Sequence, residues 1–179
     1  MGTRISNSIK KGFYSRAAYE HPLFFSFSKY TSSAMDRVGR MKLYNDTPFV
    51  TALPHINGNT GSVIGTMFEY NLLQVINEDF SEFRAQRKRS ECDIVCQYDR
   101  ILDFEIKTTS ATNAIYGNKV MSQSKDGGFL LAVNYDKHSL EVKKVRFGWI
   151  ERDGWIRQNG NGQQSRLNKD SLNVRLQYC

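Results

Sequence analysis

The chain is poor in the residues that mark several common classes of protein. Its 179 residues include only three cysteines, Cys92, Cys96 and Cys179, and an odd count of this kind does not build a disulfide framework. The three histidines have no spacing that matches a zinc site. We interpret Cys92 and Cys96 as small apolar core residues, and we expect a reducing compartment.

Long apolar runs are also missing. No stretch approaches the roughly 18 apolar residues of a membrane span, and no apolar run follows the basic residues near the N-terminus, as it would in a signal peptide. Only three prolines and thirteen glycines, with 40% hydrophobic and 24% charged residues, indicate a folded globular chain. We expect a soluble cytoplasmic protein of one domain, with no membrane partner and no organic cofactor.

Positive charge is what the chain has in excess. The net charge of +7 and the pI of about 9.4 favour an acidic partner, most often nucleic acid. Residues 1–60 combine basic with aromatic side chains and include a potential helix over residues 8–19. They form either an arm that clasps DNA or mediates dimerisation, or an irregular segment whose aromatic residues pack on the core. A second basic cluster, which we expect to contact phosphates, comprises Arg84, Arg87, Lys88 and Arg89.

Residues 62–150 show the periodicities of a catalytic core. A helix is expected over residues 62–79, with Ser62 as its N-cap and one markedly apolar face. Two strands follow, SECDIVCQ and ILDFEIKTT, with a turn at YDR between them. Residues 127–135 indicate a buried central strand, and residues 139–150 a further strand after a hairpin turn at 136–138. Residues 151–179 form a polar C-terminal segment of the same domain.

The first two strands carry a cluster of charged residues. If the hairpin turns at Asp99, Asp93 lies opposite Glu105, and Glu91 lies opposite Lys107. Because side chains alternate along a strand, Glu105 and Lys107 share one face while Phe104 and Ile106 point to the other. One face is therefore apolar, and the other collects Asp93, Glu105 and Lys107.

This arrangement suits phosphodiester hydrolysis. Two adjacent carboxylates repel each other unless a cation lies between them, and Mg²⁺ prefers such oxygen ligands, with Mn²⁺ as a substitute. The cation polarises the phosphodiester and lowers the pKa of a bound water. The lysine orients the attacking hydroxide or stabilises charge in the transition state. The alternative is a solvated hairpin face with an exposed ion pair.

The spacing of Asp93 and the tripeptide Glu105-Ile106-Lys107 resembles the PD-(D/E)xK nuclease superfamily, with Cys92 where that family has proline. The resemblance implies an α+β fold with an αβββαβ core, that is, a central mixed sheet flanked by helices. It implies Asp93 and Glu105 as metal ligands. Glu69, on the preceding helix, is the candidate for a further catalytic carboxylate. Asp103 is the alternative to Glu69, and Glu69 is then a solvent-facing residue.

Within this superfamily the chain is similar to type II restriction endonucleases. The segments GFLLAVNYDK, VRFGWI and NGNGQQSRLNK are similar to the ScaI-like group. The resemblance implies Mg²⁺-dependent hydrolysis of double-stranded DNA at a specific site by a homodimer, because one active site cuts one strand. Residues suited to DNA contacts in the polar loops are Gln123, Lys125, Asn161, Gln163, Gln164 and Arg166. A structure-specific repair or junction-resolving nuclease and a non-enzymatic DNA-binding protein are the competing hypotheses.

Overall fold

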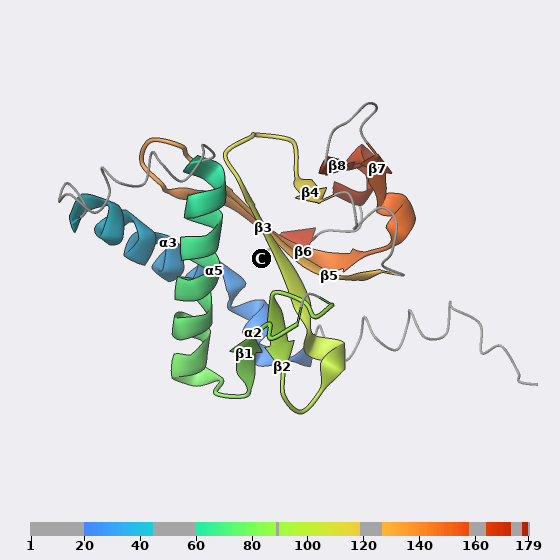
Figure 1. Ribbon diagram of the computed structural model, residues 1–179, viewed down its shortest axis with the longest axis horizontal. Coiled ribbons are helices and arrows are strands. Elements are labelled where there is room, and N and C mark those ends of the chain that lie inside the picture. Colours follow the sequence, from blue (N-terminus) through green and yellow to red (C-terminus); the bar gives the residue numbers. More distant parts are fainter. Residues whose placement is uncertain are drawn as a thin grey trace, which may run out of the picture.

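A mixed sheet forms the centre of the molecule. The computed structural model describes residues 20–44, 60–88, 90–118, 127–157, 164–172 and 177–178. Helices lie on one side of this sheet, and a small second sheet lies next to the main sheet, away from the helices (Figure 1). The predicted class, a mixed α+β sheet flanked by helices, is confirmed.

The main sheet has six strands. In spatial order they are β1 (Phe83–Ala85), β2 (Ile94–Cys96), β3 (Phe104–Thr109), β5 (Gly128–Tyr135), β6 (Val142–Ile150) and β9 (Gln177–Tyr178). The β3–β5 pair is parallel, and the other neighbouring pairs are antiparallel. The second sheet has the order β4 (Tyr116–Asn118), β8 (Gln164–Leu167) and β7 (Trp155–Arg157).

Strand β5 is buried on both faces, as its apolar run predicts. Phe129, Leu131 and Val133 enter the main core, whereas Leu130 and Ala132 enter a second core beneath the small sheet. The hairpin to β6 turns where it was expected. The Oδ1 atom of Asp136 accepts hydrogen bonds from the backbone N–H groups of the two residues at 138 and 139, both at 2.9 Å.

Helix α5 (Thr60–Asp79) covers the apolar face of the sheet. Its predicted apolar face is buried throughout and consists of Ile64, Phe68, Leu72, Val75 and Ile76. The predicted N-cap is wrong, because the helix already begins at Thr60 and Ser62 lies exposed inside it. Neither Thr60 nor Gly61 blocks helical geometry, so the helix extends two residues further upstream.

Among the described residues two helices precede α5, α2 (Pro22–Phe25) and α3 (Phe27–Tyr44), and neither was predicted. The rings of Phe24 and Phe27 lie 4.5 and 4.9 Å from the ring of Phe147 on β6, measured between centroids. These aromatic residues pack on the core, as one interpretation of residues 1–60 held, but from helices rather than from an irregular segment. Residues 1–19, with the helix expected there, lie outside the described residues. No helix in the described part is long and apolar enough to cross a membrane.

The connections around β3 contain elements that the sequence did not predict. Between β2 and β3, a 3₁₀ helix, η2 (Arg100–Leu102), takes the place of the simple turn, and Asp99 Oδ1 accepts from the Ile101 N–H at 3.0 Å. After β3, residues 110–118 contain the short strand β4 and no helix. A second 3₁₀ helix, η4 (Arg152–Gly154), links β6 to β7.

Candidate active site

The hairpin has the register that the sequence predicts. Ile94 pairs with Phe104, so Asp93, directly before β2, lies opposite Glu105 on β3. The Ile106 N–H donates to Asp93 Oδ2 at 2.8 Å. The side chain of Asp93 thus continues the hydrogen bonding just beyond the backbone pair, and its carboxylate is held over β3.

Three oxygen atoms converge on the ammonium of Lys107. Its Nζ lies 3.3 Å from Asp93 Oδ2 and 3.5 Å from Glu105 Oε2, and it donates to the main-chain carbonyl of Ile106 at 2.6 Å. The exposed fractions of the side chains are 14% for Asp93, 11% for Glu105 and 21% for Lys107. These low values do not describe a solvated surface ion pair.

Glu69 approaches the same cluster from α5. Burial raises the pKa of its carboxyl to about 7, the negative charge of Asp93 adds to the rise, and the positive charge of Lys107 opposes it. Glu69 and Lys107 also line the same hollow. The structure therefore brings together all four residues that the sequence singled out for catalysis, one from the helix and three from the hairpin.

The donor set of this cluster fits a hard divalent cation. The described residues contain no group of three or more His, Cys, Asp or Glu side chains arranged to hold a metal ion. A main-chain oxygen adds to the two carboxylates, however. The carboxylates of Asp93 and Glu105 and the carbonyl of Ile106 all contact one cation, the Lys107 ammonium. These oxygens are ligands of the kind that Mg²⁺ prefers, and Mg²⁺ keeps water or substrate phosphate in its other positions.

Glu91 does not face Lys107 as was expected. Its carboxylate forms a two-point ion pair with Arg84 at 3.0 and 3.1 Å and accepts from the N–H groups of Arg87 and Lys88. The hydrogen bond with Arg84 and the N–H of Arg87 lower its pKa to about 2. The carboxylate of Glu91 is therefore engaged by Arg84 and by the loop after β1 rather than by Lys107.

Asp103 is likewise committed elsewhere. Its Oδ1 accepts from the Cys96 N–H at 2.9 Å, and its Oδ2 forms an ion pair with Arg100. Burial raises the pKa of this carboxyl, and the hydrogen bond from Arg100 opposes the rise. Asp103 therefore secures the connection between β2 and β3, and Glu69 is the better candidate for the third carboxylate.

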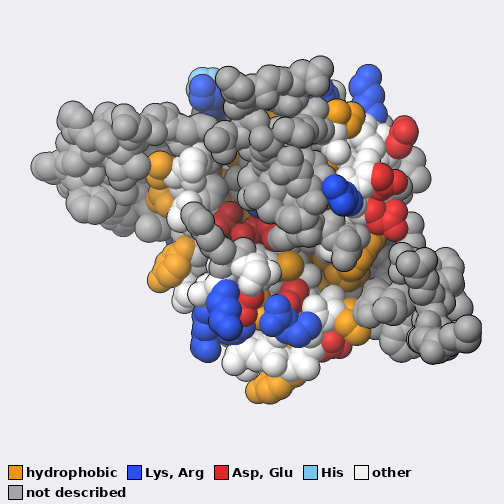
Figure 2. All heavy atoms as spheres, turned by 45° about the vertical axis from the view of Figure 1, so that its right-hand side comes forward, with side chains coloured by type: hydrophobic (Ala, Val, Ile, Leu, Met, Phe, Trp, Pro, Cys, Tyr) orange, Lys and Arg blue, Asp and Glu red, His pale blue; other side chains and the backbone are white. Residues whose placement is uncertain are grey.

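The predicted basic cluster divides into two kinds of residue. Arg84 is engaged with Glu91, whereas Arg87 and Lys88 are exposed on the loop that Glu91 holds. Arg100 is also exposed, at 63% of its side chain. Figure 2 shows lysine and arginine side chains grouped close to acidic ones on this face of the molecule. Arg89 lies outside the described residues.

The residues expected to read bases are mostly outside the described part of the chain. This holds for Gln123, Lys125, Asn161 and Gln163, and for the side chain of Gln164, the first residue of β8. Arg166 is described. It is half-buried on β8, where it lies between Tyr116 and Ile156 of the neighbouring strands.

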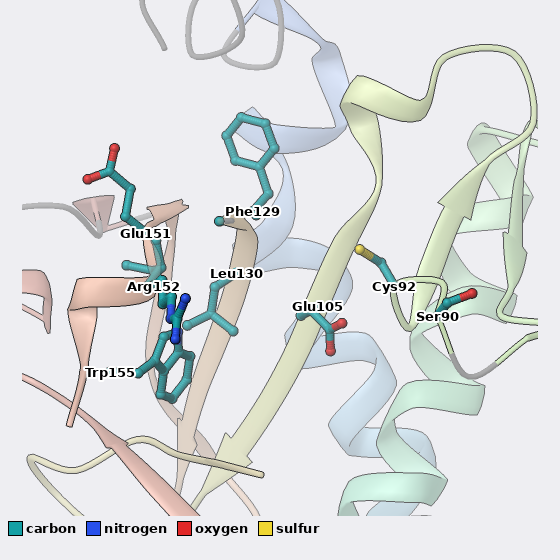
Figure 3. Close-up of a pocket in the computed structure, with 11 residues that line it drawn as sticks. Ser90, Cys92, Glu105, Phe129, Leu130, Glu151, Arg152 and Trp155 are labelled. Atoms are coloured by element: carbon teal, nitrogen blue, oxygen red, sulfur yellow. The ribbon is translucent and has the colours of Figure 1, made fainter. Parts of the chain in front are cut away.

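Two hollows adjoin the cluster, and sequence reasoning found neither. One, of about 230 Å³, lies between Glu105 and the chain around η4, and Figure 3 shows Arg152 and Trp155 across from Glu105. Cys92 lines this hollow and is half-buried, so its assignment to the core was wrong, whereas Cys96 is buried as expected. The other, of about 540 Å³, is lined by Glu69 and Lys107. The Ile106 carbonyl was also missed, because the identity of a residue does not reveal where its main-chain oxygen points.

Comparison with known proteins places this hairpin in a family. The sequence model of the ScaI restriction endonuclease family matches residues 49–178 and so includes Glu69, Asp93, Glu105 and Lys107. The chain is 32% identical over 118 residues to the type II restriction enzyme ScaI of Streptomyces caespitosus, covering 58% of this chain and 52% of that enzyme. The chain thus spans about half the length of this curated relative. No solved structure matches the chain. The chain belongs to the ScaI restriction endonuclease family.

Proposed function

We propose that this protein is a type II restriction endonuclease that hydrolyses phosphodiester bonds of double-stranded DNA at a specific site. The observation that carries the proposal is the convergence of Asp93, Glu105 and the Ile106 carbonyl on Lys107. Membership of the ScaI family supports the same reaction class. Mg²⁺ is the proposed cofactor, with Mn²⁺ as a substitute, because the three atoms that surround the Lys107 ammonium are all oxygens.

Asp93, Glu105 and the Ile106 carbonyl would hold the cation. When bound, it would polarise the phosphodiester and make a neighbouring water more acidic. Asp93 is preorganised for this task by the Ile106 N–H. The Lys107 ammonium is then placed to donate to the attacking water or to a phosphate oxygen as negative charge develops. Glu69 adds a third carboxylate beside Asp93.

The surface charge suits DNA as the partner. The chain carries a net charge of +7, and Arg87 and Lys88 are exposed on the loop that leads into Asp93. Such cations would bind phosphates on either side of the bond to be cut. The described part of each chain contributes one cluster of this kind. We propose a homodimer with two-fold symmetry, because with one active site per chain a double-strand break at one site requires two copies.

Incubation of plasmid and phage DNA with the protein and Mg²⁺, followed by gel electrophoresis, tests the proposal. The expected result is a set of discrete bands that disappears with EDTA. A smear would contradict site specificity, and cleavage of branched DNA alone would indicate a junction-resolving nuclease. Binding with no cleavage in Mg²⁺ or Mn²⁺ would instead indicate a non-enzymatic DNA-binding protein. For variants of the active-site carboxylates, the matched control is Glu141→Gln, which alters an exposed carboxylate on the β5–β6 hairpin.

A further inference from the structure

The larger of the two hollows is a polar cleft between α5 and β3. Residues 61–69 of α5 contribute one wall, residues 106–110 the floor, and Tyr116 and Gly117 of β4 another part of the lining. Glu69 and Lys107 belong to the same lining, so the cleft is continuous with the candidate active site. A chain of substrate that occupies the active site would extend into this cleft.

The lining of the cleft is rich in hydroxyl groups. They come from α5, β3 and the neighbouring strands, and belong to Ser62, Thr66, Thr108, Thr109, Ser110, Tyr116 and Tyr135. Lys107 is its cation, Glu69 its carboxylate, and three further lining residues are glycines. Hydroxyl groups donate to phosphate oxygens without adding charge, and such contacts position a nucleic acid without reading its sequence.

Thr109 is the hydroxyl best placed for such a contact. It shares a face of β3 with Glu105 and Lys107, about 6.6 Å beyond Lys107 along the strand. Its Oγ1 accepts a hydrogen bond from the Ala111 N–H at 3.1 Å. The oxygen is therefore fixed through a lone pair, and its single proton remains for donation to another acceptor.

Helix α5 approaches the floor of the cleft closely at a glycine. A Cβ atom on Gly65 would lie 3.2 Å from Thr108 Oγ1, so α5 approaches β3 closely at this point. Thr66, one turn beyond Ser62, donates its hydroxyl to the Ser62 carbonyl at 3.1 Å. With its own proton used inside the helix, Thr66 is a weaker candidate than Thr109 for donation to a ligand.

We propose that Thr109 binds the DNA phosphate next to the scissile one, and that the cleft accommodates the sugar–phosphate backbone of the same strand. The inference rests on the proposed nuclease function and extends it to a phosphate-binding site. The Thr109 O–H donates to a non-bridging oxygen of this neighbouring phosphate. The contact holds the strand in register while Lys107 meets the phosphate that reacts.

Single uncharged methylphosphonates, introduced one at a time into a duplex that contains the cleavage site, test this contact. Affinity is measured with Ca²⁺ for wild type, Thr109→Val and Thr109→Ser. The control is Thr112→Val, because Thr112 is exposed in the following turn and does not line the cleft. A hydrogen bond to a charged group corresponds to about tenfold or more in affinity. Wild type should therefore bind about tenfold more weakly when one phosphate beside the cleavage point is replaced.

Thr109→Val should bind the unmodified duplex about tenfold more weakly than wild type does. Replacing the same phosphate by a methylphosphonate should then lower the affinity of this variant by less than about a further twofold. Thr109→Ser and Thr112→Val should behave like wild type. Equal effects in wild type and Thr109→Val at every phosphate would overturn the inference, and cleavage of the unmodified duplex by wild type in Mg²⁺ would leave the nuclease function standing. The inference would also be overturned, without any variant, if a methylphosphonate at neither of the two phosphates beside the scissile one lowered the affinity of wild type. A wild-type protein that neither cuts nor binds DNA would overturn both proposals.

Discussion

The carboxylate of Asp93 and the main-chain N–H of Ile106 form a 2.8 Å hydrogen bond between two segments of the hairpin. Ile106 is the middle residue of the Glu105-Ile106-Lys107 tripeptide, and its carbonyl accepts from Lys107. One residue with an apolar side chain thus joins the three charged ones through its main chain. The geometry of the cluster therefore depends on the pairing of β2 with β3 as well as on the side chains themselves.

Asp93→Asn and Glu105→Gln should each abolish cleavage and leave the fold intact. Both changes keep the shape of the side chain and remove the negative charge that would hold a divalent cation. DNA affinity should be unchanged or higher, since a carboxylate near a phosphate is repulsive. Single-turnover cleavage, with circular dichroism to verify folding, measures the effect against Glu141→Gln. A wild-type rate in either variant would remove that residue from the proposed site.

Ca²⁺ should support DNA binding without cleavage. It accepts the same oxygen ligands as Mg²⁺, but it is larger and less strict in geometry, so it screens the carboxylates without activating water efficiently. Binding is followed by fluorescence anisotropy, and cleavage by gel, in Mg²⁺, in Ca²⁺ and in EDTA. Efficient turnover with Ca²⁺ alone, or in EDTA, would contradict the proposed dependence on Mg²⁺.

The basic residues near the hairpin could be predicted as a group from the sequence, but their separate roles could not. Arg84 and Arg87 are three positions apart and look alike in a charge count. In the structure Arg84 is held by Glu91, whereas Arg87 is exposed. The deciding feature is the path of the loop between β1 and β2, and neither charge nor strand periodicity determines it.

Replacing Arg87 and Lys88 by alanine should therefore flatten the dependence of affinity on salt. Removing a basic side chain that binds one phosphate reduces the slope of log K against log[salt] by about one unit. Arg84→Ala should instead lower stability, because it leaves the carboxylate of Glu91 without its two-point partner. Lys29→Ala, on helix α3, serves as the control for the salt slope. An unchanged slope in the Arg87 and Lys88 variants would place the DNA-binding surface elsewhere.

The strands of the core were largely predictable, whereas the N-terminal helices were not. Strand β5 is a continuous apolar run, and the helical face from Ile64 to Ile76 repeats with a clear period, so local sequence is sufficient for both. Helices α2 and α3 contain crowded aromatic residues whose burial depends on Phe147, far away in the sequence. Their structure follows from tertiary packing rather than from local periodicity.

The pKa of Glu69 predicts how the stability of the metal-free protein changes with pH. Burial raises this pKa from 4.5 to about 7, so the folded state binds the proton more tightly than the unfolded state. The carboxyl imposes no penalty at low pH. As the pH rises from 4.5 to about 7, the ionising carboxyl lowers the free energy of unfolding progressively, and the effect is complete above that range. Glu69→Gln should gain thermal stability over wild type across this window, with EDTA present. A difference in Tm that does not change with pH would show that Glu69 is not buried beside Asp93.

Replacement of Lys107 by alanine tests whether the lysine acts in the chemical step. If the Lys107 ammonium acts on the developing charge, its removal should slow the chemical step by several orders of magnitude with little change in ground-state affinity. Lys107→Arg should not rescue fully, because a planar guanidinium does not fit where three oxygens surround a compact ammonium. The measurement is single-turnover cleavage of a bound oligonucleotide in Mg²⁺. We expect a near-complete loss of cleavage, and a Lys107→Ala rate within about threefold of wild type would contradict the proposed role of this lysine.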